Sequence, residues 1–430
     1  MLRRTPALLL LIGLQAPVFA QTALPPPTEA PAGFNTPALV DNPGSQSQSN
    51  GIQIQPAGDS FTLDQQIYEK AHDVLDGLGP VFNARACVDC HANPVSGGAS
   101  QFAEIRAGHF ASGKFVAATV PIDNGASSIA ARSIINQRAV DPRAQEHVPD
   151  TENLRELRAT LNTLGDGFVE AIDDQTLIDI SNAQPGKSHG RIHGEVNLVP
   201  IFEAAGQTRV GRFGWKDQHG SLLSFVADAY VNEMGITSRL RMADVTTIGK
   251  VTTDPEDHFD NLGLEDIDHF TQFIRGTKVP PRDPELQTNS TLQANATAGE
   301  ALFDRIGCVT CHVDKIVTAK PGTTINGGFV IPAALTNKII HPYGDFLLHD
   351  IGTGGGIVQT AQYQDTAFKL RTSALWGLRT RTQYMHDLRS LTLENAILRH
   401  QGEAELVTLR FFGELNEAQR QQVIDFLNTL

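Results

Sequence analysis

One five-residue motif occurs twice in this chain and constrains its fold more than any other feature. Cys87-Val88-Asp89-Cys90-His91 and Cys308-Val309-Thr310-Cys311-His312 both read C-x-x-C-H, and together they contain all four cysteines. Two thiols at this spacing can each form a thioether with a vinyl group of haem, and the adjacent histidine then comes under the iron as its proximal ligand. The sequence therefore predicts two covalently bound haem c groups, with His91 and His312 as iron ligands.

Two other uses of paired cysteines explain the pattern less well. A zinc site needs four ligands close together, but Cys90 and Cys308 are far apart and no second C-x-x-C lies near either motif. A thioredoxin-like dithiol would not need a histidine after both pairs.

The first 20 residues have the organisation of a secretory signal peptide. A short basic region (1–4) precedes an apolar run (7–14), and small residues at 18–20 form a cleavage site. An uncleaved membrane anchor is the alternative, but neither this run nor any later one is long enough to span a bilayer stably. We expect a mature chain without a transmembrane segment and a periplasmic location, because c-type haem attachment in bacteria takes place outside the inner membrane.

Acidic residues outnumber basic ones, 48 to 34, which gives a net charge of −14. Removal of Arg3 and Arg4 with the signal peptide would make the mature chain more negative still. This balance argues against nucleic acid and anionic membrane surfaces as partners. It would attract a basic electron donor such as a small cytochrome c, although the charge could also serve solubility alone. The sequence does not indicate an oligomeric state.

The chain divides into a leader and two unequal haem units. Residues 21–60 are rich in Pro, Gly, Ser and Gln and predict a disordered or loosely attached leader. We expect an N-terminal cytochrome c-like domain over 61–290 and a C-terminal cytochrome c domain over 291–430. The predicted fold class is mainly α, with a long, partly irregular insertion (109–240) that carries a few short strands, one of them at 115–120.

A helix is expected to close the first unit over 264–276. Ile267, Phe270 and Ile274 share one face of this helix, and Gly276 would form its C-cap.

The second unit is expected to open and close with helices of its own. A capping box at 297–300 predicts the start of a helix that leads to Cys308. A second capping pattern at 416–419 begins an amphipathic last helix, with Val423 and Phe426 on its apolar face.

Further segments of the chain carry a family resemblance. They are Gly77-Leu78-Gly79-Pro80-Val81-Phe82-Asn83-Ala84-Arg85, Gly211-Arg212-Phe213-Gly214-Trp215-Lys216, Leu375-Trp376-Gly377-Leu378, His386-Asp387 and Thr392-Leu393-Glu394-Asn395-Ala396. With the haem motifs, they resemble the bacterial di-haem oxidoreductases (also labelled thiol oxidoreductases), relatives of the di-haem cytochrome c peroxidases and of the methylamine-utilisation di-haem enzyme. The resemblance covers residues 60–430 and implies one haem that activates peroxide and another that relays electrons. Four thioether-linked cysteines would leave no thiol for thiol chemistry.

The sixth iron ligand decides whether each haem is closed or open to an oxidant. Met385, in Tyr384-Met385-His386-Asp387, is similar to the segment that supplies the methionine of the electron-transfer haem in the peroxidases. We expect Met385 to ligate the second haem, with His349, His386 or Tyr384 as the alternatives.

For the first haem, the resemblance implies a tryptophan between the haems and a glutamate on the peroxide side. Trp215 matches the tryptophan, and Glu233 matches the glutamate with a two-residue shortening. The glutamine and proline positions of the peroxidases hold Phe225 and Ala229. The alternatives are that Trp215 is a core aromatic and Glu233 a surface residue, or that nearby Met234 or Met242 closes this haem.

Two functions stay open on the sequence. The first is a di-haem peroxidase-like enzyme, with Glu233 and Trp215 as catalytic residues. The second is a pure electron-transfer cytochrome, which Phe225 in place of the glutamine favours. A calcium ion is expected only by analogy with the peroxidases, because the sequence shows no acidic loop pattern for it.

Overall fold

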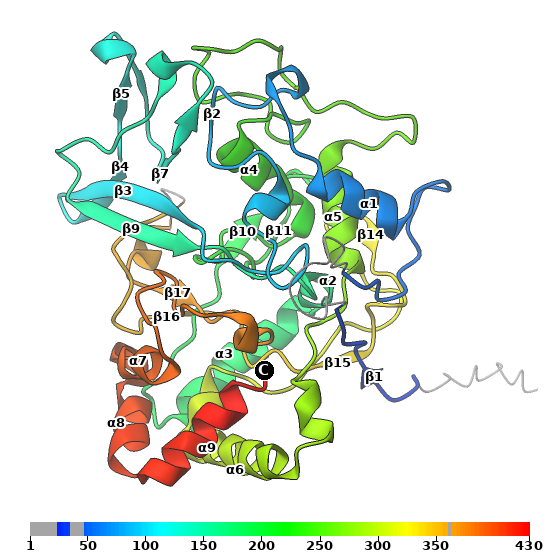
Figure 1. Ribbon diagram of the computed structural model, residues 1–430, viewed down its shortest axis with the longest axis vertical. Helices are drawn as coiled ribbons and strands as arrows, with labels where there is room; N and C mark the ends of the chain where they lie inside the picture. Colours follow the sequence, from blue (N-terminus) through cyan, green and yellow to red (C-terminus); the bar gives the residue numbers. More distant parts are fainter. Residues whose placement is uncertain (1–23, 35–46, 360–362) are drawn as a thin grey trace, which may run out of the picture.

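The computed structural model describes residues 24–34, 47–359 and 363–430 (Figure 1). The helices are α1 (Phe61–Glu69), α2 (Asp166–Glu170), α3 (Asp174–Lys187), α4 (Leu222–Ala229), α5 (Asp266–Gly276), α6 (Ser290–Ile306), α7 (Leu393–Leu398), α8 (Glu405–Gly413) and α9 (Glu417–Leu427).

The strands are short except for two in the insertion. They are β1 (Thr28–Glu29), β2 (Val81–Phe82), β3 (Ala103–Ala111), β4 (Lys114–Ala117), β5 (Val120–Ile122), β6 (Ser127–Ile129), β7 (Ile134–Ile135), β8 (Arg138–Ala139), β9 (Leu154–Ala159), β10 (Leu198–Pro200), β11 (Thr208–Val210), β12 (Ile316–Val317), β13 (Thr324–Ile325), β14 (Phe329–Val330), β15 (Lys338–Ile340), β16 (Leu348–His349) and β17 (Leu370–Arg371).

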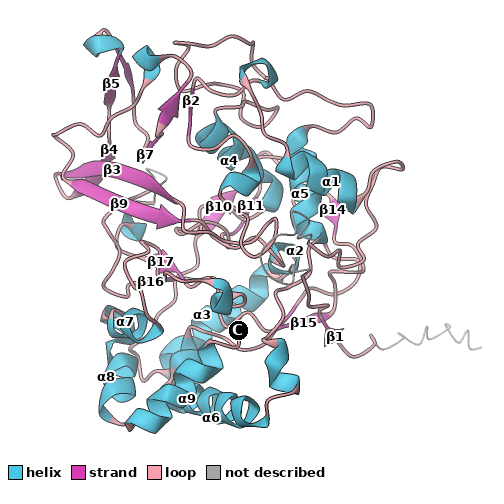
Figure 2. Cartoon of the chain, in the orientation of Figure 1, coloured by secondary structure: helices cyan, strands magenta, loops and turns pink. Residues whose placement is uncertain are grey.

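Two helical groups lie in opposite halves of the molecule. Figure 1 shows α1, α4 and α5 together in one half, whereas α6 to α9 gather at the other end. Figure 2 shows the magenta strands of the insertion beside the first group. Each C-x-x-C-H motif follows the first helix of its group, so each half supplies one haem-attachment segment.

In the first half, α1 packs against α5. Phe61 and Tyr68 of α1 contact the ring of Phe273, with ring centroids 5.3 and 4.6 Å apart. The helix at 264–276 was predicted and is present, with its apolar face buried. Gly276, however, is the last helical residue and not a C-cap with positive φ. A side chain there would meet the Phe61 ring at 2.7 Å, so glycine is needed for close packing of the two helices.

In the second half, α6 packs against α9. The capping pattern at Asn416 is confirmed: its side chain accepts from Gln419 N, and Gln419 Oε1 accepts from Asn416 N in return. The predicted capping box at 297–300 was wrong, because α6 begins at Ser290 and is capped by Asn289. Thr297 lies inside the helix, where its hydroxyl donates to the Gln293 carbonyl.

The insertion contains more sheet than expected. β3 pairs antiparallel with β9 over six residues, from Ala103↔Ala159 to Gly108↔Leu154, and also with β4 and β7. The predicted strand at 115–120 is divided between β4 and β5. With 31% helix and 17% strand, the fold is mixed, and the prediction of a mainly α chain is corrected.

Parts of the expected leader, residues 21–60, contact the rest of the fold within the described ranges. β1 pairs with β15, and the Asn50 side chain donates to the carbonyls of Arg275 and Thr277 at the end of α5. The predicted signal peptide, residues 1–20, lies outside the described residues. Among the helices of the described ranges, none has the length and apolar character needed to cross a membrane.

The main buried core extends past the boundary expected near residue 290. It joins α2, α4 and α5 with Ile316, Ile340 and Phe346 from the second expected domain. A separate core lies between α6, α8 and α9. The segment after the second haem motif therefore connects the two halves through buried apolar contacts.

Candidate functional site

The first haem motif opens onto a cavity of about 210 Å³ in the first half. Cys87, Cys90 and His91 line it, together with apolar side chains from α4 and α5. Burial lowers the pKa of His91 to about 4, so the ring is neutral at physiological pH. Its Nδ1 is buried without a hydrogen-bond partner. A neutral imidazole beside two cysteines is the donor set that a covalent haem requires.

The second motif lines a cavity of almost equal volume, about 200 Å³, between α6, α7 and α9. His312 Nδ1 lies 2.9 Å from the Tyr343 carbonyl oxygen, which fixes the proton on Nδ1 and leaves Nε2 as the metal-binding atom. Burial and the neighbouring His400 lower the pKa of His312 to about 4.

Each cavity is lined by an arginine that could meet the carboxylates of a haem, although Arg158 already lies 3.7 Å from a Glu156 carboxylate oxygen. Arg158 lines the first cavity, and its Nε and Nη2 are buried without acceptors. Arg381 lines the second, and burial lowers the pKa of its guanidinium to about 10. The propionates of a haem would provide acceptors for these groups. The cysteines, the neutral histidines and the arginines of the two linings therefore fit one haem in each cavity.

Trp215 lies between the two cavities and lines both of them. Its indole Nε1 donates to the Ala159 carbonyl at the end of β9 (2.8 Å), and its ring lies edge-on to His386 (centroids 6.1 Å apart). The next residue, Lys216, is buried and ties this segment to residues 366–369. Its side-chain nitrogen donates to the carbonyls of Thr366, Ala367 and Lys369.

Glu233 also lines the first cavity, within a π-helical turn (Tyr230–Met234) that follows α4. Its side chain accepts from Asn83 Nδ2 at 2.7 Å. Burial, and then the nearby carboxylate of Glu104, raise the pKa of Glu233 well above its usual 4.5. Burial acts in the same direction on Glu104, but Arg106, the hydrogen bond with Glu233 and Arg158 together hold the pKa of Glu104 below its usual value. The pair therefore shares one proton at neutral pH, and Glu233 holds it.

The segment before the first haem motif fixes the position of this turn. Asn83 N and Ala84 N donate to the Glu233 carbonyl, and Gly79 N donates to the Met234 carbonyl. Gly235 ends the turn at a φ of +71°, and a side chain there would approach the Gly79 carbonyl oxygen to 2.7 Å. Glycine is therefore required for this close contact.

Three of the four other residues considered for the first haem line this cavity. Phe225 and Ala229 line the cavity at the positions that hold glutamine and proline in the peroxidases. Met234 lines it as well, whereas Met242 is 62% exposed and lies away from it.

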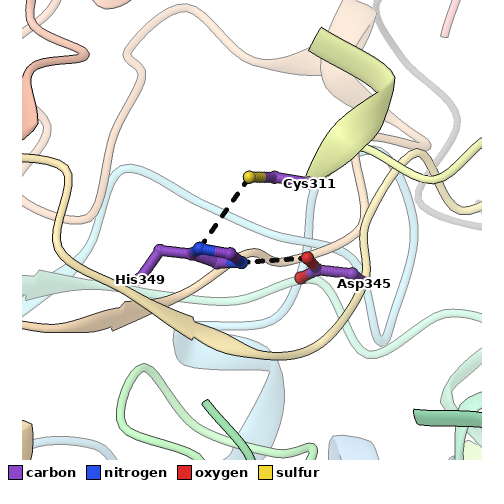
Figure 3. Close-up of side chains that lie close together, drawn as sticks. All are labelled: Cys311, Asp345 and His349. Atoms are coloured by element: carbon purple, nitrogen blue, oxygen red, sulfur yellow. Dashed lines mark hydrogen bonds and ion pairs between the residues drawn. The ribbon is translucent and has the colours of Figure 1, made fainter. Parts of the chain in front are cut away.

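Met385 lines the second cavity with Tyr384, His386 and His400. His349, one of the alternatives from sequence, is held elsewhere. Figure 3 shows its ring between Asp345 and Cys311, with Nε2 2.9 Å from Asp345 Oδ2 and Nδ1 3.8 Å from the Cys311 sulfur. Glu403 lies 3.0 Å from Nδ1. Both ring nitrogens are thus engaged by carboxylates, so His349 does not offer a free lone pair to an iron.

Comparison with known proteins agrees with this geometry. Residues 144–430 match the family described as "Di-haem oxidoreductase, putative peroxidase". The chain belongs to the di-haem oxidoreductase family. The matched region includes Trp215, Glu233, the second haem motif and Met385, and it begins after the first motif. The resemblance seen in the sequence and the assignment to an oxidoreductase family are thereby confirmed.

No curated protein matches the chain. Hydrazine synthase of Kuenenia stuttgartiensis has a distantly similar structure, with 16% identity and a TM-score of 0.27. The similarity covers 43% of this chain and 59% of that one, less than two thirds of its length.

Several residues of this family member's site were missed in the sequence. Glu104, Arg106 and Arg158 come from β3 and β9, strands whose position beside Glu233 has no local sequence signal. His400 lines the second cavity and follows α7, within the region that matches the family. Its distance in sequence from the haem motif hid its proximity to His312.

Among the described residues, one group of three carboxylates is close enough together to be considered for the calcium ion expected by analogy. In the described part of the chain, Asp244, Asp254 and Glu256 lie close together, but the ammonium of Lys250 bridges all three. The ammonium of this lysine already contacts all three carboxylates in the place that a cation would take.

Proposed function

We propose that this di-haem oxidoreductase is a periplasmic enzyme of the peroxidase type. Hydrogen peroxide would be reduced in the His91 cavity, with electrons delivered through the His312 cavity. The observation that carries the proposal is the position of Trp215, which lines both cavities and so connects them through one aromatic side chain.

The residues that would hold the two cofactors are those of the two motifs. Cys87 and Cys90 would attach the first haem and Cys308 and Cys311 the second, with His91 and His312 as proximal ligands. A haem so held supplies an iron that exchanges electrons and, where its sixth position is open, binds an oxidant. Met385, or another side chain of the second cavity, would close that position on the relay side.

Glu233 would supply the proton chemistry. Reduction of hydrogen peroxide to two waters takes up two electrons and two protons, and O–O cleavage needs a proton on the departing oxygen. Because its pKa is raised, Glu233 holds a proton that it can donate to this oxygen. Asn83 orients the carboxyl, and the ionised Glu104 beside it favours return of a proton to Glu233 rather than its loss to solvent.

The electron donor would be a basic periplasmic protein such as a small cytochrome c. The net charge of −14 supports this choice, since opposite charge steers association. The signal-peptide pattern of the first 20 residues supports export to the periplasm.

A pure electron-transfer cytochrome is the second candidate. Met234 lines the first cavity, and a thioether ligand from it would close the first haem to peroxide.

Rapid mixing of the fully reduced protein with hydrogen peroxide tests the proposal. Wild-type protein should oxidise both haems and consume peroxide in the presence of a reduced cytochrome c. Trp215→Phe should slow oxidation of the second haem by at least about 10-fold, because it removes the indole that lines both cavities. Phe259→Leu, at a 61% exposed position that lines neither cavity, is the control for loss of an aromatic ring, and its rate should match that of wild type. A wild-type protein that consumes no peroxide with any donor would refute the enzymatic function.

A further inference from the structure

His400 lies at the distance from His312 that a shared iron would impose. The two ring centroids are 6.3 Å apart, and both rings line the second cavity. An imidazole nitrogen binds a first-row metal ion at about 2 Å and lies about 1 Å from the centre of its ring, so two imidazoles on opposite sides of one iron have ring centres roughly 6 Å apart.

Both rings are held in the tautomer that a metal ligand needs. His400 Nδ1 lies 2.8 Å from the Ala396 carbonyl oxygen, just as His312 Nδ1 lies 2.9 Å from that of Tyr343. A carbonyl oxygen can only accept, so each Nδ1 carries the hydrogen and each Nε2 keeps a free lone pair.

The backbone of His400 is also fixed. Ala396 belongs to α7, so the ring is tied to the end of that helix. The hydroxyl of Thr408, in α8, donates to the His400 carbonyl at 2.6 Å. These contacts hold the ring on the cavity wall without help from a cofactor.

His386 and Met385 are the competing ligands in this cavity, and both ring nitrogens of His386 are buried without a hydrogen-bond partner. The His386 ring lies against Trp215, and its Nε2 is 3.9 Å from a Glu156 carboxylate oxygen. Met385 lines the cavity from a turn at a φ of +69°, and its thioether is the alternative ligand.

We infer that His400 is the sixth ligand of the iron held by His312, so that the second haem is ligated by two histidines. The inference rests on the proposed function only in assigning a relay role to this haem. Without a thioether ligand, the second haem would have a lower reduction potential than a histidine–methionine haem. A donor able to reduce it must then have a correspondingly low potential.

Near-infrared magnetic circular dichroism of the oxidised holoprotein tests this inference, because bis-imidazole and imidazole–thioether ferric haems give different spectra. Wild type should show the bis-imidazole spectrum for one low-spin haem. His400→Leu should turn that haem high-spin, or replace its spectrum by the thioether type if Met385 moves in. Met385→Leu should leave it unchanged. Met242→Leu, at a 62% exposed position, is the matched control for loss of a methionine.

An imidazole–thioether spectrum in wild type that Met385→Leu abolishes would overturn the inference and leave Met385 as the ligand. The wild-type spectrum decides between a histidine and a methionine as the sixth ligand even if a variant fails to fold, and His400→Leu then tells His400 from His386. Peroxide consumption is measured separately. Bis-imidazole ligation without peroxide turnover would refute the proposed function alone, and turnover with thioether ligation would refute this inference alone.

Discussion

Glu233 is the residue on which the proposed chemistry depends most. Its carboxyl is held by Asn83, and burial together with Glu104 raises its pKa. Replacement by glutamine keeps the shape and can keep the hydrogen bond from Asn83, but it removes the acidic proton of the carboxyl group. Glu233→Gln should lower peroxide turnover by roughly 10²–10⁴-fold, the range for one acid–base group, and should keep two haems. Glu394→Gln, at an exposed site on α7, is the control and should leave turnover unchanged.

The raised pKa of Glu233 also predicts how the free energy of unfolding changes with pH. The unfolded chain loses this proton near pH 4.5, whereas the folded protein keeps it to higher pH. Between these values the folded state binds more protons, so the contribution of Glu233 to the free energy of unfolding falls as pH rises. Denaturant unfolding across this range should show a smaller decline for Glu233→Gln than for wild type. An identical slope in both proteins would mean that Glu233 is ionised in the folded state.

Among single residues, the sequence identifies those that attach haem more readily than the side chains that surround them in the fold. The C-x-x-C-H spacing identifies His91 and His312 because the chemistry is local in the chain. Trp215 and Glu233 follow only from family resemblance, and their placement in the first cavity agrees with it. Glu104 and His400 could not be found this way, because strand pairing and helix packing bring them to the cavities from distant segments.

At the scale of elements, the contact between α6 and α9 supports the second cavity. Gly299 is buried where the two helices cross, and a Cβ atom there would lie 1.9 Å from the Gln422 carbonyl oxygen. Phe303 of α6 and Leu427 of α9 line the cavity from this contact. The helices must therefore separate if Gly299 gains a side chain.

Gly299→Ala should lower the free energy of unfolding by about 3 kcal/mol, at the upper end of ordinary overpacking costs, because backbone has to move. Gly186→Ala should have the opposite effect. This helical glycine of α3 is exposed, and a Cβ atom there would meet nothing within 4 Å. The substitution should therefore raise the free energy of unfolding by about 0.4–1 kcal/mol. Chemical denaturation of both variants checks the pair. Equal stabilities for the two would contradict the close helix contact.

Elements with strong local signals were predicted well and the others were not. The capping box of α9 and the apolar face of α5 depend on residues within one or two turns. The start of α6 was placed too late because Asn289 provides a cap without a capping-box partner. The β3–β9 pairing is long-range, so its extent could not be read from either segment alone.

At the scale of the whole molecule, the two halves are joined by one shared core and by Trp215. Residues after the second haem motif pack into the core of the first half, so the halves do not separate at the expected boundary. Mass spectrometry of the mature protein should find two haems and no cysteine that reacts with an alkylating reagent. A single haem, or a titratable thiol in the folded protein, would refute the assignment of both motifs.

The proposed function requires the two haems to differ, one open to peroxide and one closed by a second protein ligand. Electron paramagnetic resonance of the oxidised and half-reduced protein tests this most directly, because it reports the spin state of each ferric haem. We predict one low-spin signal from the haem on His312, and a high-spin signal from the haem on His91 in at least one of these redox states. A haem on His91 that is six-coordinate and low-spin in both states would contradict it.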